Sequence, residues 1–127
     1  MAGFSLSTPP YIKYSTTSHI VGEMPDGKPI YEKTIITKAT ILATTSDIGQ
    51  IIDNTMSNYL LIDYDGVMTG VIDGSKKGNA VPMFYNSTNY VYIRQLNSND
   101  HAITCVMYGS HYLNRTIIAT IRFIPRS

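Results

Sequence analysis

The chain alternates short β-prone runs with turn signals, and this alternation constrains its fold more than any other feature. The turn signals recur roughly every 8–12 residues, a spacing typical of antiparallel sandwiches and barrels, because each strand crosses one small sheet before the chain turns back. The runs consist largely of Thr, Ile, Val and Tyr, which make up 47 of the 127 residues. These side chains fit a pleated, half-buried surface.

The clearest strand lies near the C-terminus. There Ile117, Ala119, Ile121 and Phe123 alternate with mostly polar residues, and this period of two predicts one face on a core. Further strands are predicted at 38–44, either as a separate strand or as the continuation of the one before it, and at 80–85, 90–96 and 101–108. Turns are predicted at 86–89, 97–100 and 109–111, and a loop at 73–79. The segment 46–53 breaks the alternation and predicts, at most, a short helical turn capped by Ser46 or Asp47.

Two Asp-Gly pairs between β-prone runs predict hairpins, because Asp-Gly tolerates the positive φ angles of a tight turn. The first hairpin joins 19–24 to 29–36 through Asp26, Gly27 and Lys28, with Pro29 at the start of its second strand. The second joins 59–64 to 67–72 through Asp65 and Gly66. The pattern Asp63-x-Asp65-Gly66 also matches the opening of a calcium loop, but the later ligands are absent, so a hairpin is predicted there.

These patterns predict one all-β domain at 14–127, an antiparallel β-sandwich or jelly-roll-like fold. A chain of 127 residues can bury a sizeable core without disulfides. Residues 1–13 contain Pro9-Pro10, which blocks helix and predicts an extended N-terminal arm. The single cysteine, Cys105, lies in an apolar run and is predicted to be a buried structural thiol rather than a nucleophile.

Charge and motifs argue against several classes of function. The net charge of +1 comes without clustered Lys and Arg, so neither nucleic acid nor an anionic membrane is an expected partner. The chain has no signal-peptide pattern and no apolar run near the ~20 residues of a membrane helix. The three histidines lack metal-ligand spacing, and no catalytic motif is present. We therefore expect no enzyme activity, cofactor or metal.

Tyrosine is the residue type that points to a surface. The chain has ten Tyr and no Trp. Tyr90 and Tyr92 share one face of a predicted strand, and Tyr108 and Tyr112 lie in or near a strand end. Tyr is favoured at subunit interfaces and sugar-binding surfaces, where one end of the ring is apolar and the other wet. The alternative is that these four are core-edge residues of a small sheet.

The first hairpin lies within a longer motif, Tyr-Ser-x-x-x-x-x-Val-Gly-x-x-x-Asp-Gly-Lys-Pro-Ile-Tyr-x-Lys-Thr-Ile, which begins at Tyr14. This motif resembles a domain of structural proteins of tailed phages and prophages, often found at the end of longer tail or fibre proteins. That family typically reads Trp-Ile-Asp-Gly-Lys-Pro, and here Met24-Pro25 replaces Trp-Ile. The segment 47–53 is similar to the family's next element. The segment 121–125 departs from its usual closing Tyr-Thr-Lys.

The resemblance implies a trimeric, β-rich virion part that covers or adheres to something, made in the host bacterial cytoplasm. It implies no catalytic residues, and the hairpin at Asp26–Pro29 carries over as a structural signature. Because only about 13 residues precede the domain, we expect a capsid-decoration or head-fibre protein, or a small tail or baseplate component, in contact with other virion proteins. The alternatives are a receptor-binding tip for a host cell-surface glycan and a small polysaccharide hydrolase.

Overall fold

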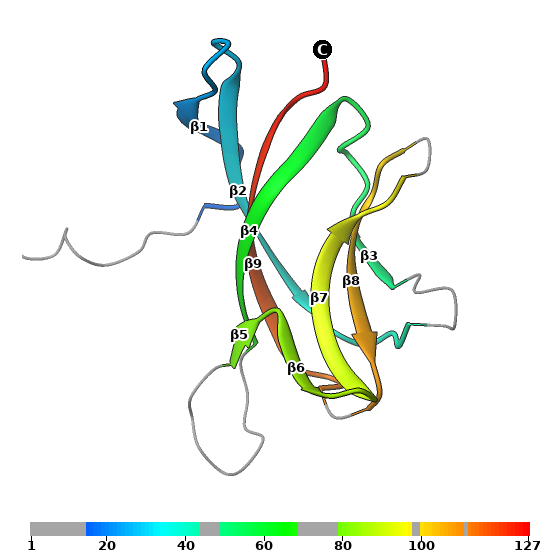
Figure 1. The fold of residues 1–127 in the computed structure, drawn as a ribbon. Coiled ribbons are helices and arrows are strands. Elements are labelled where there is room, and N and C mark those ends of the chain that lie inside the picture. The colour runs from blue at the N-terminus through cyan, green and yellow to red at the C-terminus, as the bar shows by residue number, and fades with distance from the viewer. Residues whose placement is uncertain (1–14, 44–48, 69–78, 98–99, 111) are drawn as a thin grey trace, which may run out of the picture.

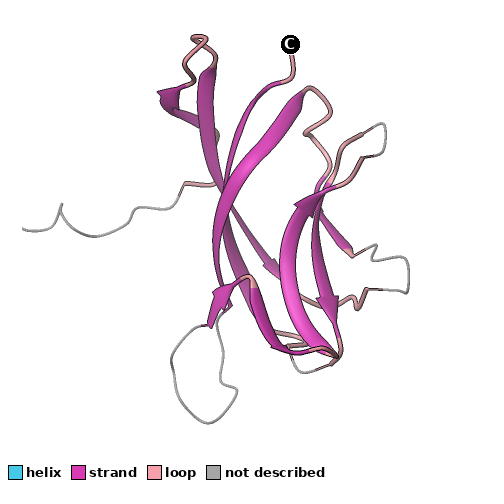
Figure 2. Cartoon of the chain, viewed as in Figure 1, coloured by secondary structure: helices cyan, strands magenta, loops and turns pink. Residues whose placement is uncertain are grey.

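The computed structural model describes residues 15–43, 49–68, 79–97, 100–110 and 112–127. Within these ranges the chain forms nine strands, paired antiparallel in two sheets that face one another (Figure 1). Figure 2 shows strands and loops only, with no helix in the described residues. The predicted all-β sandwich is therefore confirmed.

The first sheet has the strand order β1-β2-β9-β4-β5, and the second has the order β3-β8-β7-β6. The strands of the first sheet are β1 (His19–Glu23), β2 (Pro29–Lys38), β9 (Thr116–Pro125), β4 (Tyr59–Met68) and β5 (Asn79–Val81). Those of the second are β3 (Gln50–Asp53), β8 (Ile103–Tyr108), β7 (Asn89–Gln95) and β6 (Met83–Asn86). The long strand β9 lies at the centre of the first sheet, between β2 and β4.

The core lies between the sheets, and the predicted alternation of β9 builds its first layer. Ile117, Ala119, Ile121 and Phe123 are all buried, as their spacing predicted. The second sheet contributes buried side chains from β7 and β8, among them Cys105. The prediction of a buried thiol is confirmed, and burial raises the pKa of Cys105 to about 12.

The predicted first hairpin is present, with a loop of three residues. The backbone N–H of Gly27 donates to the carbonyl of Met24 at 2.8 Å, and Met24 N–H donates to the carbonyl of Lys28 at 2.7 Å. Gly27 adopts a φ of 89°, which glycine reaches without steric cost. Asp26 accepts a bond from Lys28 N–H at 3.1 Å. This is a turn followed by a glycine bulge, a common three-residue hairpin connection.

The predicted second hairpin is wrong. Strand β4 runs from Tyr59 to Met68 without turning, so Asp65 and Gly66 lie inside it. Both residues have tertiary partners that keep the strand extended. The carboxylate of Asp65 binds Arg122 on the neighbouring strand β9. A Cβ on Gly66 would lie 3.0 Å from the Cβ of Val81, so glycine permits the close approach of β5.

The predicted strand at 38–44 is also wrong, because β2 ends at Lys38 and residues 39–43 are not strand. The side chain of Gln50 substitutes for a neighbouring strand here. Its amide oxygen accepts from the backbone N–H groups of Thr40 at 2.9 Å and Ile41 at 3.3 Å, and its amide nitrogen donates to Lys38 O at 2.9 Å. These bonds satisfy the backbone while the chain passes from one sheet to the other.

Two further segments differ from their predictions. Part of the predicted helical turn, Gln50–Asp53, is strand β3, which pairs with β8, while Ser46 and Asp47 lie outside the described residues. The predicted strand at 80–85 is divided at Pro82, with β5 in the first sheet and β6 in the second. Proline has no N–H to give to a ladder, so it is well placed where the chain changes sheets.

Side chains bridge the facing edges of β4 and β7. Gln95 accepts from Leu61 N–H at 3.0 Å and donates to the carbonyls of Tyr59 and His101, both at 3.0 Å. The Tyr64 hydroxyl accepts from the N–H of Ile93 at 3.2 Å. Strand-edge groups that lack a neighbouring strand thus find partners across the sandwich, and the two sheets are held together on this side.

Candidate functional site

The outer face of the second sheet carries a cluster of aromatic rings, which we call the aromatic strip: Phe84, Tyr90, Tyr92 and Tyr108. In β7, Val91 is buried in the core, so its neighbours Tyr90 and Tyr92 point to the opposite face. The strand register places Phe84 of β6 and Tyr108 of β8 on either side of Tyr90. The strip therefore crosses three neighbouring strands.

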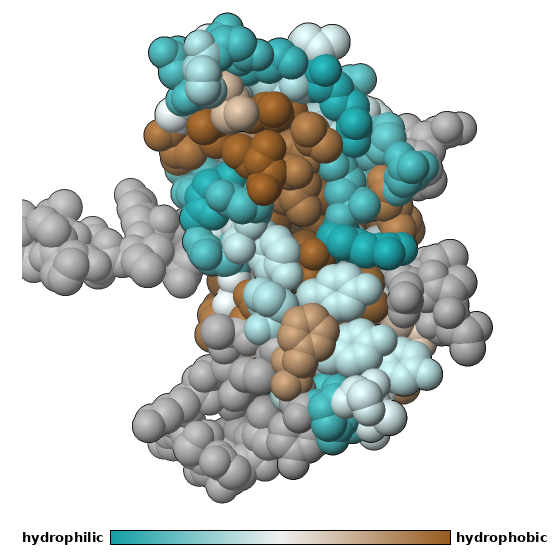
Figure 3. Space-filling model, in the orientation of Figure 1, coloured by the Kyte–Doolittle hydropathy of each residue, from teal (hydrophilic) through white to brown (hydrophobic). Residues whose placement is uncertain are grey.

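The four rings contact one another in a continuous series. Tyr90 and Tyr108 stack with centroids 5.4 Å apart and an interplanar angle of 9°, and Tyr90 and Tyr92 stack at 6.1 Å and 19°. Phe84 lies 5.6 Å from Tyr90 and 6.2 Å from Tyr92. Phe84 is 62% exposed, whereas the tyrosines are half-buried. In Figure 3 a hydrophobic side chain lies among pale ones over β6 and β7.

The structure brings together three of the four tyrosines that the sequence nominated. Tyr90, Tyr92 and Tyr108 are in the strip, but Tyr112 is 1% exposed and packs in the core, so its assignment to a surface is corrected. Tyr112 follows the turn after β8, where the chain returns between the sheets toward β9. Sequence reasoning missed Phe84. Counting cross-strand pairs back from the turn at 86–89 would have placed Tyr85 opposite Tyr90, because the register shift between Phe84 and Asn86 cannot be read from the sequence.

Arg94 continues the same face of β7, two residues beyond Tyr92. Its Nε is buried and has no hydrogen-bond partner. Among the described residues, no carboxylate forms an ion pair with Arg94. The outer face of the second sheet thus combines a partly exposed aromatic cluster with a cation that has no ion-pair partner among the described residues.

On the outer face of the first sheet, by contrast, the arginine is paired with carboxylates. Arg122 of β9 binds Glu32 of β2 at 3.1 Å, and Asp63 and Asp65 of β4 at 2.6 and 2.5 Å. Hydrogen bonds to Asp65 and Asp63 raise the pKa of Arg122. The two aspartates predicted to form a hairpin, with a calcium loop as the alternative, instead hold this guanidinium across three strands. We call this group the Arg122 cluster.

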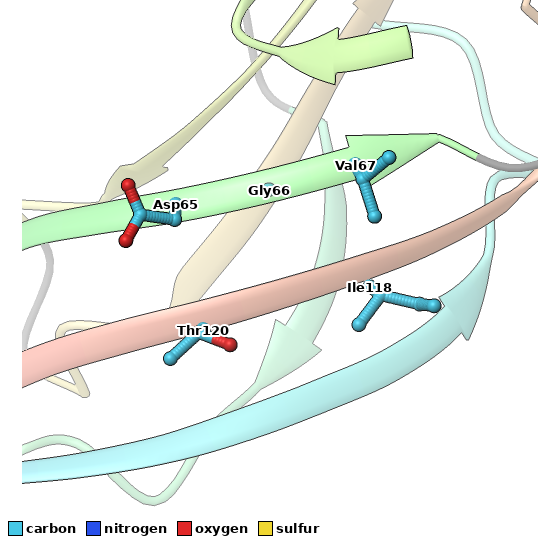
Figure 4. A pocket seen from close by; sticks show the side chains of 5 residues that line it. All are labelled: Asp65, Gly66, Val67, Ile118 and Thr120. Atoms are coloured by element: carbon cyan, nitrogen blue, oxygen red, sulfur yellow. The ribbon is translucent and has the colours of Figure 1, made fainter. Parts of the chain in front are cut away.

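A shallow hollow lies beside the Arg122 cluster, with a volume of about 240 Å³ that includes space open to solvent. It is lined by Asp65, Gly66, Val67, Ile118 and Thr120. Figure 4 shows these side chains on the adjacent strands β4 and β9. Its polar side chains are already engaged, since Thr120 shares a buried 2.8 Å hydrogen bond with Thr34 and Asp65 binds Arg122. The hollow therefore offers no unpaired acid or base for chemistry.

The two histidines in the described part of the chain lie in different elements and form no metal-ligand set. His19 lies 3.5 Å from Glu32 on the exposed edge strand β1, His101 is in the connection between β7 and β8, and His111 lies outside the described residues. In those same ranges no group of three or more His, Cys, Asp or Glu is arranged to hold a metal ion. The described residues also contain no helix long and apolar enough to cross a membrane.

Comparisons with protein-family models, with curated proteins and with solved structures found no match for this chain. The case for function therefore depends on the geometry of the aromatic strip and on the motif around the first hairpin. The strip is the stronger candidate site, because Phe84 is 62% exposed and the neighbouring Arg94 has no ion-pair partner within the described residues.

Proposed function

We propose that this protein is a non-enzymatic structural component of a bacteriophage virion that self-associates on the particle surface. A capsid-decoration or head-fibre protein, or a small tail or baseplate part, fits best. The exposed aromatic strip is the observation that carries the proposal, because aromatic clusters on a sheet face are typical of protein interfaces. The motif that begins at Tyr14 supports the assignment to a virion.

Apolar side chains on the first sheet support contacts with more than one neighbour. Ile20 of β1 and Ile36 of β2 are 63% and 58% exposed, far from the aromatic strip on the second sheet. In a cyclic trimer each subunit presents two different patches, one to each neighbour. This chain has exposed apolar side chains on both sheets and so has two such patches. A chain with a single patch could not form a cyclic trimer in this way.

A receptor-binding tip that recognises a host cell-surface glycan is the second candidate, and the same strip favours it. Tyrosine combines a ring that packs against the apolar face of a sugar with a hydroxyl that can donate or accept a hydrogen bond. Three tyrosines and one phenylalanine in contact on one sheet face would give both kinds of contact.

The molar mass in solution tests self-association, measured by light scattering on a sizing column. We expect a mass near three times 14.1 kDa. Phe84→Ser returns it toward the monomer value when assembly uses the strip, and Ile36→Ser does so when assembly uses the first sheet, whereas Ile41→Ser, which changes an exposed side chain outside both patches, should not. A monomer at every concentration would contradict self-association. Antibodies raised against the protein should label phage particles from the strain that encodes it, and unlabelled particles would contradict a place in the virion.

A further inference from the structure

We propose that the aromatic strip and Arg94 together form a binding site for an acidic saccharide. The proposal rests on the glycan-recognition candidate above and specifies the chemical class of its ligand. Tyr90, Tyr92 and Arg94 occupy alternate positions of β7 and so share its outer face. A strand rises about 3.3–3.4 Å per residue, so the site extends about 13 Å from Tyr90 to Arg94, enough for a short oligosaccharide.

The charge of Arg94 selects the ligand class. Its guanidinium has no ion-pair partner among the described residues, while Arg122 on the other sheet has three. A guanidinium binds a carboxylate or phosphate through paired hydrogen bonds of matching geometry. The buried Nε of Arg94 has no hydrogen-bond partner in the free protein, and an unsatisfied buried N–H is energetically costly. An anionic group on the ligand would supply the missing counter-charge.

The rings supply the remaining contacts. Phe84 lies on the edge strand β6, at one end of the stacked series, and is the most exposed ring of the strip. It can pack against the apolar face of a sugar ring, while the neighbouring tyrosine hydroxyls bond to sugar hydroxyls. The site therefore offers an apolar platform, hydrogen-bonding groups and a cation in sequence along one face.

Other occupants match this surface less well. A second copy of the chain that covered the strip would remove Arg94 from water without offering it a carboxylate from its own strip, and an unpaired buried charge is costly. A neutral glycan would pack against the rings but would leave the guanidinium of Arg94 without a counter-charge. An acidic saccharide uses both features, so it is the occupant to which we commit.

The test is an NMR titration of the ¹⁵N-labelled protein with acidic oligosaccharides bearing uronate, sialate or phosphate groups. Trigalacturonic acid and its fully methyl-esterified form make a matched pair that differs in charge but keeps the same sugar rings. We expect at least one acidic oligosaccharide to shift amide signals of β6, β7 and β8, and the charged form to bind about tenfold more tightly than its neutral counterpart. Arg94→Gln should abolish that preference, and Arg94→Lys should restore part of it.

Arg126→Gln is the control for overall charge, since Arg126 is exposed near the C-terminus and should leave binding unchanged. Equal binding of charged and neutral oligosaccharides would overturn the acidic class while leaving glycan recognition intact. No binding by any oligosaccharide would overturn both. If Phe84→Ser then also reduced the molar mass, the strip would be an interface between copies. Well-dispersed spectra of each variant would show that it is folded.

Discussion

Replacement of two glutamines tests whether burial determines how much a side-chain hydrogen-bond bridge contributes to the free energy of unfolding. Gln95 makes three bonds of 3.0 Å to partly buried backbone groups, two of them to Leu61 and Tyr59 at the edge of β4 and one to His101 in the connection between β7 and β8. Gln50 makes a comparable set of bonds to the end of β2 and the segment after it, but most of these lie at the exposed surface. The two side chains are chemically identical, so their surroundings alone should set the cost of removal.

The Gln95→Leu substitution would leave one N–H and two carbonyls without partners. A buried polar group left unsatisfied costs about 1–3 kcal/mol, and partial exposure places each of these at the lower end of that range. We therefore expect the variant to lose about 2–4 kcal/mol of unfolding free energy. At Gln50 water can reach the freed groups, so Gln50→Leu should cost about 1 kcal/mol or less.

Urea unfolding followed by far-ultraviolet circular dichroism measures both losses. The midpoint should fall much further for Gln95→Leu than for Gln50→Leu, with the slope unchanged, because both native states bury similar surface. Gln95→Glu sharpens the test, since its carboxylate would face two carbonyl oxygens and should destabilise the protein as well. Equal losses at the two glutamines would refute the argument that burial decides.

Two ionisable residues of the core and its border give further predictions. Burial raises the pKa of Cys105 to about 12, so iodoacetamide at pH 8 should leave this thiol unmodified in the folded protein and alkylate it in urea. Mass spectrometry would measure the extent of alkylation. Rapid labelling without urea would contradict the burial of Cys105. Burial alone would raise the pKa of Asp53, but hydrogen bonds from Lys33 and Thr55 and the charge of Lys33 hold it below 3.8. This stabilisation is present above the unfolded pKa and is lost as pH falls through the lower folded value. The stability advantage of the natural chain over Asp53→Asn should therefore shrink below about pH 4 in urea titrations, and an advantage that is constant down to pH 2 would contradict it.

The two Asp-Gly pairs show where the sequence sufficed and where it did not. At Asp26-Gly27 the partners of the turn lie within four residues, so local chemistry decided the outcome and the hairpin was predictable. At Asp65-Gly66 the deciding partner is Arg122, 57 positions along the chain. The ion pair with β9 favours an extended strand over the local turn. The alternation of β9 was predictable for the same reason as the first hairpin, because it needs no knowledge of distant residues.

In the candidate site, too, local features could be predicted from the sequence and long-range ones could not. Tyr90 and Tyr92 share a face by simple alternation, and Arg94 follows on the same period, so their common face was readable from the sequence. That Arg94 has no acidic partner among the described residues was not readable, because it depends on where each carboxylate lies in the fold. Tyr112 shows the converse, since a tyrosine near a strand end turned inward and became part of the core.

The two proposed uses of the aromatic strip exclude one another on a single copy of the chain. A neighbouring subunit packed on Phe84 would cover the ring that an oligosaccharide needs, and the strip is the largest ring cluster on the described surface of the second sheet. The first sheet can still serve self-association, because Ile20 and Ile36 lie on a different sheet and Arg122, on its outer face, is already neutralised. An oligomer that survives Phe84→Ser while losing oligosaccharide binding would therefore assign assembly to the first sheet and recognition to the second.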